Sequence, residues 1–364
     1  MNGGYLTIMN KIEKSTDIKK LIKELSERSA VSGEERGAFQ LVKDFLSNYT
    51  DEIRTDPLDN LIARRAGTAE DIKVMLAAHL DEIGLMVKSI DDNGFLKFAT
   101  VGGIDPRTLP AQEVIVNGRK EITGVIGAMP PHLLSRDKRK KAHKLEDLYI
   151  DTGLELEEVK KNINIGDTVT IKRELTYLEN DYVSGKALDD RAGVLMMLET
   201  ARELDKIKHQ ADVYFVATSQ EEVGLKGSET AAYDIFPDVG IAIDVCHGQM
   251  PGVDRGDASE MAKGPAVAFG PQVHPDIYQL LTKTAEERSI PYQKEASTTP
   301  YGTDAASIQI ARSGVATALI SIPLRYMHTS VEVISLQDVK SGAQLLARTI
   351  AEIDQDFLEG LTCY

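Results

Sequence analysis

The feature that most constrains the fold is a short apolar run followed almost directly by two adjacent glutamates. Residues 213–217, Val-Tyr-Phe-Val-Ala, predict a β-strand that is buried on both faces. Glu221 and Glu222 follow this strand, and Gly224 indicates a turn. In open α/β sheets, ligands bind at the edge formed by the carboxyl ends of the strands. The sequence therefore predicts an α/β sheet that carries two carboxylates at its ligand-binding edge.

Two other predicted strands also lead into polar side chains. Residues 74–78 are apolar and precede His79 and Asp81, which project to the same side of an extended segment because one residue separates them. This geometry suits a metal-bound imidazole with a supporting carboxylate. An isolated His-x-Asp is more often a strand-end histidine with a polar neighbour. Residues 239–243 form another apolar run, and Asp244 follows it. Both runs add candidate ligands to the same edge.

Further candidates lie beside predicted helices. Asp189 and Asp190 precede an apolar helix, so they are either N-caps of that helix or, in the case of Asp189, a metal ligand. His328 follows a predicted strand at 316–320 and precedes a long predicted helix at 336–353. The helix start and the strand end both place these side chains near the edge where the glutamates lie.

The candidate ligands thus converge on one edge of one sheet: His79, Asp189, Glu222, Asp244 and His328. Imidazoles mixed with carboxylates are typical of two-metal hydrolytic sites, in which one carboxylate bridges metals about 3.5–4 Å apart. Glu221 stands next to a candidate ligand. Each residue alone is a weak signal, and their convergence favours a hydrolytic metal site.

The middle of the chain has a different residue pattern. Between residues 84 and 180, short β-like runs alternate with glycine, asparagine, aspartate and proline, which predicts a compact β-barrel or sandwich. It lies between two α/β regions, so we expect an inserted β-rich domain at 84–180. Residues 1–83 and 181–364 are then expected to form one α/β domain that carries the metal site.

Charge and cysteine content limit the partners and the compartment. The formal net charge of −15 argues against nucleic acid and anionic membranes as main partners. Cys246 and Cys363 are the two cysteines, and no Cys-x-x-Cys is present, so we expect no disulfide framework and a cytoplasmic protein. Neither a signal peptide nor a transmembrane stretch is expected.

A few other polar residues are interpreted as structural or solvent-exposed residues without a functional role. Ser32 and Glu35 are predicted to form a capping box that opens a helix used only for packing. His132 and His247 are interpreted as loop or turn histidines without a role. The basic run at 136–141 is interpreted as a solvated loop because aromatic residues are not interleaved with it.

The motifs around the candidate ligands resemble those of the M42 metallo-aminopeptidases, a family with tetrahedral assemblies whose members are sometimes labelled endoglucanases by mistake. The resemblance covers nearly the whole chain, and no ligand position of the family is substituted. The β-rich insert lies early, between His79 and Asp189, whereas the M20 deacylases carry their extra domain late and the M28 aminopeptidases lack so large an early insert. The matching motifs are Ala-His79-Leu-Asp81-Glu-Ile-Gly, Lys186-Ala-Leu-Asp189-Asp190-Arg191, Gln220-Glu221-Glu222-Val-Gly-Leu, Ile243-Asp244-Val, Gly302-Thr303-Asp304-Ala and Arg325-Tyr326-Met-His328-Thr-Ser.

The resemblance implies a fold and a role for each site residue. The fold is a zinc-peptidase-like α/β/α sandwich with a mixed central sheet, plus an inserted small β-barrel of the kind used for dimerisation. A cis peptide bond is expected between the paired aspartates. By this resemblance, His79 and Asp244 would hold one metal, Glu222 and His328 would hold the other, and Asp189 would bridge the two. Asp190 would support Asp189, and Asp81 would tune the histidine. Glu221 would act as general base and acid.

The implied activity is removal of the N-terminal residue of peptides by a metal-bound hydroxide, with Glu221 as the general base. Two divalent ions per subunit are expected, Zn²⁺ or Co²⁺, with Mn²⁺ as a further candidate. The implied partners are peptides with a free N-terminus and further copies of the chain, as dimers that assemble into a tetrahedral dodecamer. An M20-type amidohydrolase, deacylase or dipeptidase is the first alternative, and a non-enzymatic binding protein is the second.

Overall fold

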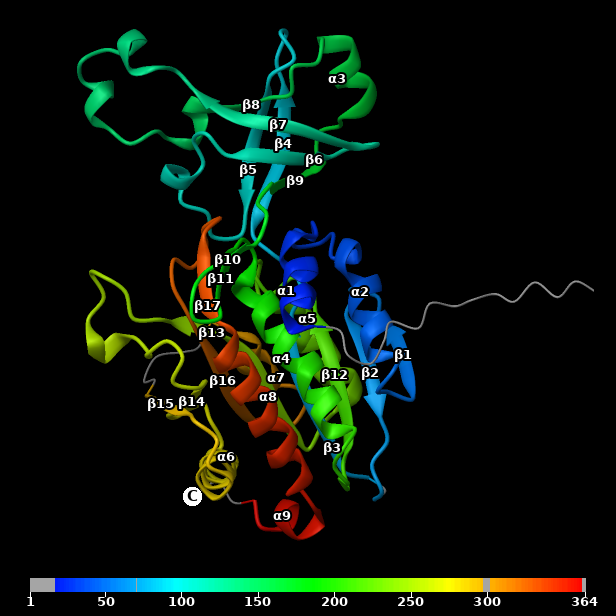
Figure 1. Cartoon of the computed structure of the whole chain (residues 1–364). Coiled ribbons are helices and arrows are strands. Elements are labelled where there is room, and N and C mark those ends of the chain that lie inside the picture. Colours follow the sequence, from blue (N-terminus) through cyan, green and yellow to red (C-terminus); the bar gives the residue numbers. More distant parts are fainter. Residues whose placement is uncertain (1–16, 70, 297–301, 362–364) are drawn as a thin grey trace, which may run out of the picture.

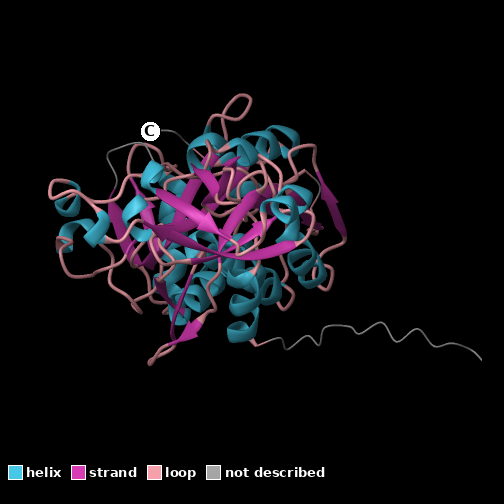
Figure 2. Ribbon diagram, turned by 90° about the horizontal axis from the view of Figure 1, so that it is seen from above, coloured by secondary structure: helices cyan, strands magenta, loops and turns pink. Residues whose placement is uncertain are grey.

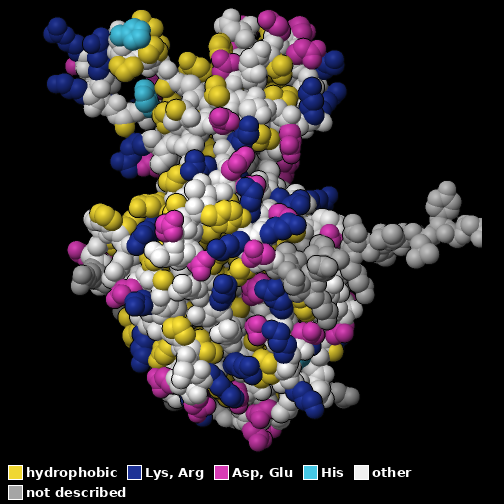
Figure 3. All heavy atoms as spheres, in the orientation of Figure 1, with side chains coloured by type: hydrophobic (Ala, Val, Ile, Leu, Met, Phe, Trp, Pro, Cys, Tyr) yellow, Lys and Arg dark blue, Asp and Glu magenta, His cyan; other side chains and the backbone are white. Residues whose placement is uncertain are grey.

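The computed structural model describes residues 17–69, 71–296 and 302–361. A small barrel stands on a larger body built around a mixed sheet, and only a few chain segments join the two (Figure 1). The space-filling view shows a narrowed region between them (Figure 3). The ligand motifs before and after the β-rich stretch belong to the larger body.

The central sheet is mixed, as expected. Its four middle strands, β12, β3, β13 and β16, run parallel to one another, and β2 and β14 pair antiparallel on either side of them. Parallel strands buried on both faces read as continuous apolar runs. In sheet order the strands are β1 (Glu52–Thr55), β2 (Leu61–Arg65), β12 (Asp212–Thr218), β3 (Lys73–His79), β13 (Val239–His247), β16 (Ala316–Leu324), β14 (Ala266–Phe269) and β15 (Gln293–Ala296).

Helices cover both faces of this sheet (Figure 2). The helix α4 is buried along almost its whole length, because it packs against the sheet and also against α1 and α8. The helices α5 and α7 contact each other and the strands β12, β3 and β13. The helices are α1 (Ile18–Glu27), α2 (Arg36–Leu46), α4 (Leu188–Leu204), α5 (Lys226–Ile235), α6 (Pro275–Arg288), α7 (Asp304–Gln309), α8 (Leu336–Ala351) and α9 (Gln355–Glu359).

The β-rich stretch forms a closed barrel with its own apolar core. Burial alternates along β7, as expected for a strand with one face in a core. One short helix, α3 (Leu156–Asn162), accompanies the barrel. Its strands, in barrel order, are β4 (Gly84–Ile90), β5 (Leu96–Val101), β8 (Leu148–Asp151), β7 (Glu121–Ala128), β6 (Glu113–Asn117) and β9 (Thr168–Ile171). The closed barrel confirms the barrel expectation rather than the sandwich.

A small second sheet lies beside the end of α4. It contains β10 (Thr176–Tyr177), β11 (Tyr182–Gly185) and β17 (Glu332–Ser335), which pair antiparallel. β11 leads into the Asp189 segment, and β17 follows the His328 segment. This pairing brings two ligand motifs that are far apart in sequence to the same place.

The predicted capping box at Ser32 and Glu35 is wrong. The helix α2 begins at Arg36 without a side-chain cap. The Ser32 hydroxyl instead donates a hydrogen bond to the carboxylate of Asp81. Glu35 Oε1 accepts hydrogen bonds from the Gly33 N–H at 2.7 Å and the Gln220 N–H at 3.1 Å. Both residues therefore support the segment that carries the glutamate pair.

None of the helices in the described residues is both long and apolar enough to cross a membrane.

Candidate metal and catalytic site

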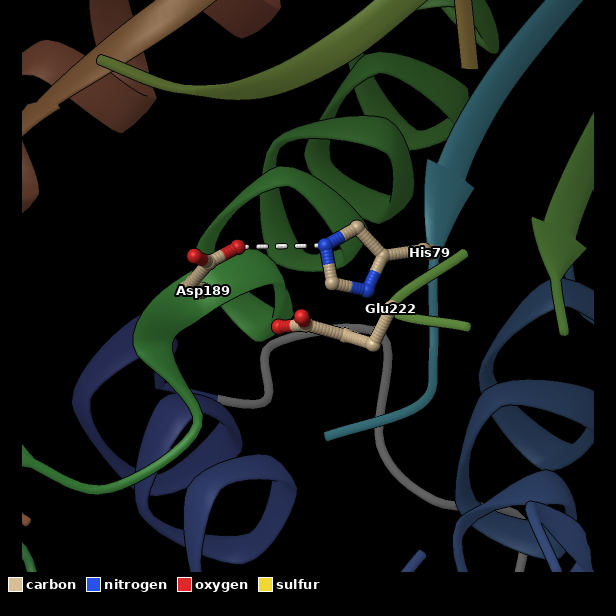
Figure 4. A group of neighbouring side chains, drawn as sticks. All are labelled: His79, Asp189 and Glu222. Atoms are coloured by element: carbon tan, nitrogen blue, oxygen red, sulfur yellow. Dashed lines mark hydrogen bonds and ion pairs between the residues drawn. The ribbon is translucent and has the colours of Figure 1, made fainter. Parts of the chain in front are cut away.

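His79 is the last residue of β3 and is buried. Its Nδ1 lies 3.1 Å from the main-chain oxygen of Asp81 and 3.6 Å from the Asp81 carboxylate. Its Nε2 lies 3.1 Å from Asp189 Oδ1 (Figure 4). One nitrogen is thus held by the Asp81 segment, and the other faces the neighbouring carboxylates.

Asp81 also contacts the glutamate pair. Its carboxylate accepts hydrogen bonds from the N–H groups of Glu221 and Glu222, each at 3.1 Å. Asp81 is fully buried, so these bonds satisfy a charge that water cannot reach. The residue therefore fixes the backbone of the segment that follows β12 as well as the ring of His79.

Asp189 lies between the two histidines. Its Oδ1 faces His79, while its Oδ2 lies 3.3 Å from Nε2 of His328. The same His328 nitrogen lies 3.3 Å from Glu222 Oε1. Asp189 and Asp190 both have non-helical dihedrals, and the Asp190 carboxylate rather than that of Asp189 accepts the hydrogen bond from the Gly193 N–H, so Asp189 is not the side-chain cap of α4. The geometry places one oxygen of Asp189 toward each imidazole.

Asp244 and Asp190 lie on the His79 side of this cluster. β13 pairs with β3 only as far as Ala242, so Asp244 comes just past the last paired residue although β13 itself continues. Asp190 Oδ1 accepts a hydrogen bond from the Gly193 N–H at 2.9 Å. The peptide bond between Asp189 and Asp190 is cis, which confirms that expectation.

A residue next to the barrel helps to orient the ring of His328. Nδ1 of His328 lies 2.8 Å from the carbonyl oxygen of Gly103, in the segment that follows β5. A Cβ added at Gly103 would lie only 2.9 Å from this nitrogen. A protonated Nδ1 donates to that oxygen, which leaves Nε2 facing Asp189 and Glu222. His132, by contrast, is exposed on a barrel loop, and His247 is exposed at the end of β13.

The electrostatics of the cluster fit bound cations. Burial and the carboxylates of Asp244 and Asp304 raise the pKa of Glu221 to about 10. Burial also raises the pKa of Asp244, with a further contribution from Asp189. Hydrogen bonds to Asp189 and Glu222 raise the pKa of His328 to about 11. These groups therefore share a strong excess of buried negative charge, which divalent cations would offset.

The donor geometry supports the same assignment. Two groups of side chains, His79 with Asp189 and Glu222, and His79 with Asp190 and Asp244, each offer ligand atoms within 4.8 Å of one another. Asp190 Oδ2 is buried and has no hydrogen-bond partner among the described residues. Imidazole and carboxylate donors suit Zn²⁺, Co²⁺ and Mn²⁺. The residues present therefore fit a metal centre.

Glu332 is a site residue that sequence reasoning missed. Its Oε2 accepts hydrogen bonds from the N–H groups of Leu188 at 2.7 Å and Asp189 at 3.2 Å. Its Oε1 accepts one from the His328 N–H at 2.8 Å. His328 and Ala187 have left-handed φ values of 60° and 54°, which non-glycine residues rarely adopt. One buried carboxylate therefore holds two unusual backbone segments that carry candidate ligands.

The substitution Glu332→Gln should weaken metal binding by about 10–100-fold, the range typical for partners that orient metal ligands. Glutamine keeps the volume but replaces one acceptor oxygen with an N–H₂ group that faces backbone N–H donors. Calorimetric titration of metal into chelator-treated protein measures the affinity. Glu287→Gln, on an exposed position of α6, serves as the matched control. Equal affinity in both variants would contradict this role for Glu332.

Three comparisons with known proteins agree with the fold and indicate one family. A family model described as M42 glutamyl aminopeptidase matches residues 59–345. A lysyl aminopeptidase from Pyrococcus furiosus is 39% identical over 340 residues, which cover 92% of this chain and 96% of that protein. The structure of a TET aminopeptidase from a marine sediment thaumarchaeon has a TM-score of 0.90 and 32% identity, covering 95% of this chain and 99% of that one. The Pyrococcus horikoshii TET1 peptidase, which can assemble into a tetrahedron or a large octahedral shell, has a TM-score of 0.82 and 31% identity, covering 93% and 100%.

The mixed sheet, the closed barrel and the cluster of imidazoles and carboxylates define a peptidase of the metal-dependent class. The chain belongs to the M42 family of aminopeptidases.

Proposed function

We propose that this chain removes the N-terminal residue from peptides at a centre that holds two divalent cations. The observation that supports this most strongly is the position of Asp189, whose two carboxylate oxygens face two different imidazoles at 3.1 and 3.3 Å. A carboxylate between two sets of donors is the arrangement of a bridging ligand. His79 and Asp244 would hold one cation, and Glu222 and His328 would hold the other.

The bound cations would polarise the peptide carbonyl and lower the pKa of a water molecule. Glu221 is the residue proposed to move protons. Its Oε2 lies 4.0 Å from His79 Nε2, and no described residue donates a hydrogen bond to its carboxylate. Glu221 would take a proton from the attacking water and later give it to the leaving amine. Asp81 supports this role by fixing the N–H of Glu221.

The free α-amino group of the substrate would lie among the carboxylates. A protonated or partly protonated amine is favoured by a cavity lined by Asp189, Glu221, Glu222 and Asp244. This preference would explain exopeptidase action, because an acylated N-terminus lacks that group. The family model is described as glutamyl aminopeptidase, whereas one relative is a lysyl aminopeptidase, so family membership leaves the preferred residue open.

One experiment tests this function against the deacylase and the binding-protein alternatives. Chelator-treated protein, reconstituted separately with Zn²⁺, Co²⁺ or Mn²⁺, is assayed on free-amine aminoacyl-anilides and on their N-acetylated counterparts. We expect hydrolysis of free-amine substrates only, with activity lost on chelation and restored by metal. Preferential cleavage of the acetylated series would favour the deacylase instead. Failure of the reconstituted protein on both series would favour the binding protein.

We also propose that residues 84–180 are an inserted domain through which copies of this chain associate as dimers, and that 1–83 with 181–364 form the catalytic domain. The separate core of the barrel supports this division. Exposed apolar side chains on the barrel, among them Val125, Met129 and Leu133, support a surface that another copy covers. The shell-forming behaviour of the TET1 peptidase suggests a tetrahedral dodecamer of such dimers. Light scattering on the purified chain measures the oligomer.

A further inference from the structure

The candidate metal centre opens into a cavity of about 460 Å³. His79 and the candidate metal-binding carboxylates line one part of it. Another part is lined by residues that no step of the proposed mechanism uses, among them Cys246, Glu295 and Ser321. A cavity of this size beside the reacting centre has room for the first side chain of a peptide.

Glu295 is an acidic side chain in an unusual environment. It lies on the edge strand β15, and its neighbours Lys294 and Ala296 are exposed while Glu295 itself is half-buried. Its Oε2 is shielded from solvent and has no hydrogen-bond partner among the described residues. Burial raises the pKa of this carboxyl, and the Ser321 hydroxyl beside it opposes the shift. A carboxylate held in this way is unfavourable unless a cation or a donor is supplied.

Glu295 lines the same cavity as the metal centre, although β16 and β14 lie between β15 and β13 in the sheet. Ser321 on β16 pairs directly with Asp244 on β13, and neighbouring strands lie about 4.8 Å apart. Both side chains project to the same face because they are register partners in a parallel pair. Glu295 lies beside Ser321 on that face, as the hydrogen bond that influences its pKa indicates. β15 is three positions from β13 in the sheet, but the Glu295 side chain reaches Ser321, whose strand is the neighbour of the Asp244 strand.

The charges around the cavity indicate what would complete this site. Among the described residues that line it, none is lysine or arginine, and Lys294 lines only the neighbouring cavity that Glu295 also borders. The carboxylates at the metal centre have cations and a substrate amine as partners in the proposed function. Glu295 lines the same cavity on a different strand and has no such partner in the proposed function. A lysine side chain carries its ammonium on a flexible four-carbon stem, which suits a carboxylate set back from the α-carbon.

We propose that Glu295 binds the ammonium or guanidinium group of a basic N-terminal residue, so that peptides beginning with lysine or arginine are the preferred substrates. This inference rests on the aminopeptidase function proposed above. Glu295 would be a specificity-determining residue with no part in bond cleavage.

The test compares lysyl and norleucyl p-nitroanilides, which differ only in the terminal group of the side chain. In the metal-loaded native chain, we expect kcat/KM to be about 10–100-fold higher for the lysyl substrate, the range for a hydrogen bond to a charged group. Glu295→Gln should abolish most of this preference and leave the norleucyl value nearly unchanged. Calorimetric binding of free L-lysine and L-norleucine should show the same difference without turnover.

Glu287→Gln is the matched control, because Glu287 is exposed on α6 and does not line this cavity. Equal kcat/KM for the two substrates in the native chain would overturn the inference without affecting the proposed function. A loss of activity on both substrates in Glu295→Gln by the same factor, with the native preference retained, would also overturn it. If the native chain hydrolyses no aminoacyl-anilide with any metal, the aminopeptidase function fails, and this inference fails with it.

Discussion

The substitution Glu221→Gln is expected to lower kcat by about 10²–10⁴-fold, the usual contribution of a general acid–base group. Glutamine has the same shape but cannot accept a proton from water. Metal content should stay at the native level, because the candidate metal ligands are other residues. Substrate binding should also change little, so KM should remain near the native value. Steady-state kinetics on an aminoacyl-anilide and elemental analysis of the same sample measure both quantities.

Glu229→Gln gives the control for this prediction. Glu229 lies in the first turn of α5, a few residues after Glu221, and its side chain is exposed. Its substitution should leave both kcat and metal content unchanged. Near-native kcat in Glu221→Gln with intact metal would show that another group moves the proton. Loss of metal in Glu221→Gln would instead make Glu221 a ligand.

The strand arrangement could be predicted because apolar runs report burial directly. Residues 213–217, 74–78 and 239–243 lie in β12, β3 and β13, which are neighbours in the sheet. Their shared parallel direction brings His79 and Glu221 to the same edge. The polar residues that follow such runs therefore indicate a site from local sequence alone.

The Asp189 segment could not be interpreted from local sequence. Two aspartates before an apolar helix are equally typical of an N-cap. The distinction depends on side-chain contacts, since the Asp190 carboxylate accepts from the Gly193 N–H as a cap does, whereas the Asp189 carboxylate faces His79 and His328. Family resemblance, rather than residue pattern, made Asp189 a candidate bridge.

The residues that hold the ligand segments in place could not be identified from the sequence. Glu35 accepts a hydrogen bond from the N–H of Gln220, whose φ is 55°, and Glu332 does the same for His328. Each carboxylate stabilises a left-handed backbone conformation that carries a candidate catalytic or ligand residue. Glu35 and Gln220 are 185 positions apart in the sequence, so no local pattern relates them. Ser32 and Glu35 even matched a capping box, because spacing alone does not show which donors a side chain meets.

The substitution Asp189→Asn is expected to remove both metal ions. A bridging carboxylate supplies one oxygen to each cation, and the asparagine amide keeps only one oxygen and carries no charge. At a metal concentration that saturates the native chain, elemental analysis should find less than one ion per chain, and activity should be lost. Asp92→Asn, at an exposed position in the turn after β4, should retain the native metal content.

The comparison with Asp244→Asn separates a bridging role from an ordinary ligand role. Asp244 lies on the His79 side of the cluster and is proposed to serve one cation only, so its substitution should leave the ion on Glu222 and His328 in place. Removal of Asp189 should therefore lower the metal content further than removal of Asp244. If Asp189→Asn retains one tightly bound ion, each cation can bind without the shared carboxylate. The 3.1 and 3.3 Å approaches of Asp189 to the two histidines would then describe two separate contacts rather than a bridge.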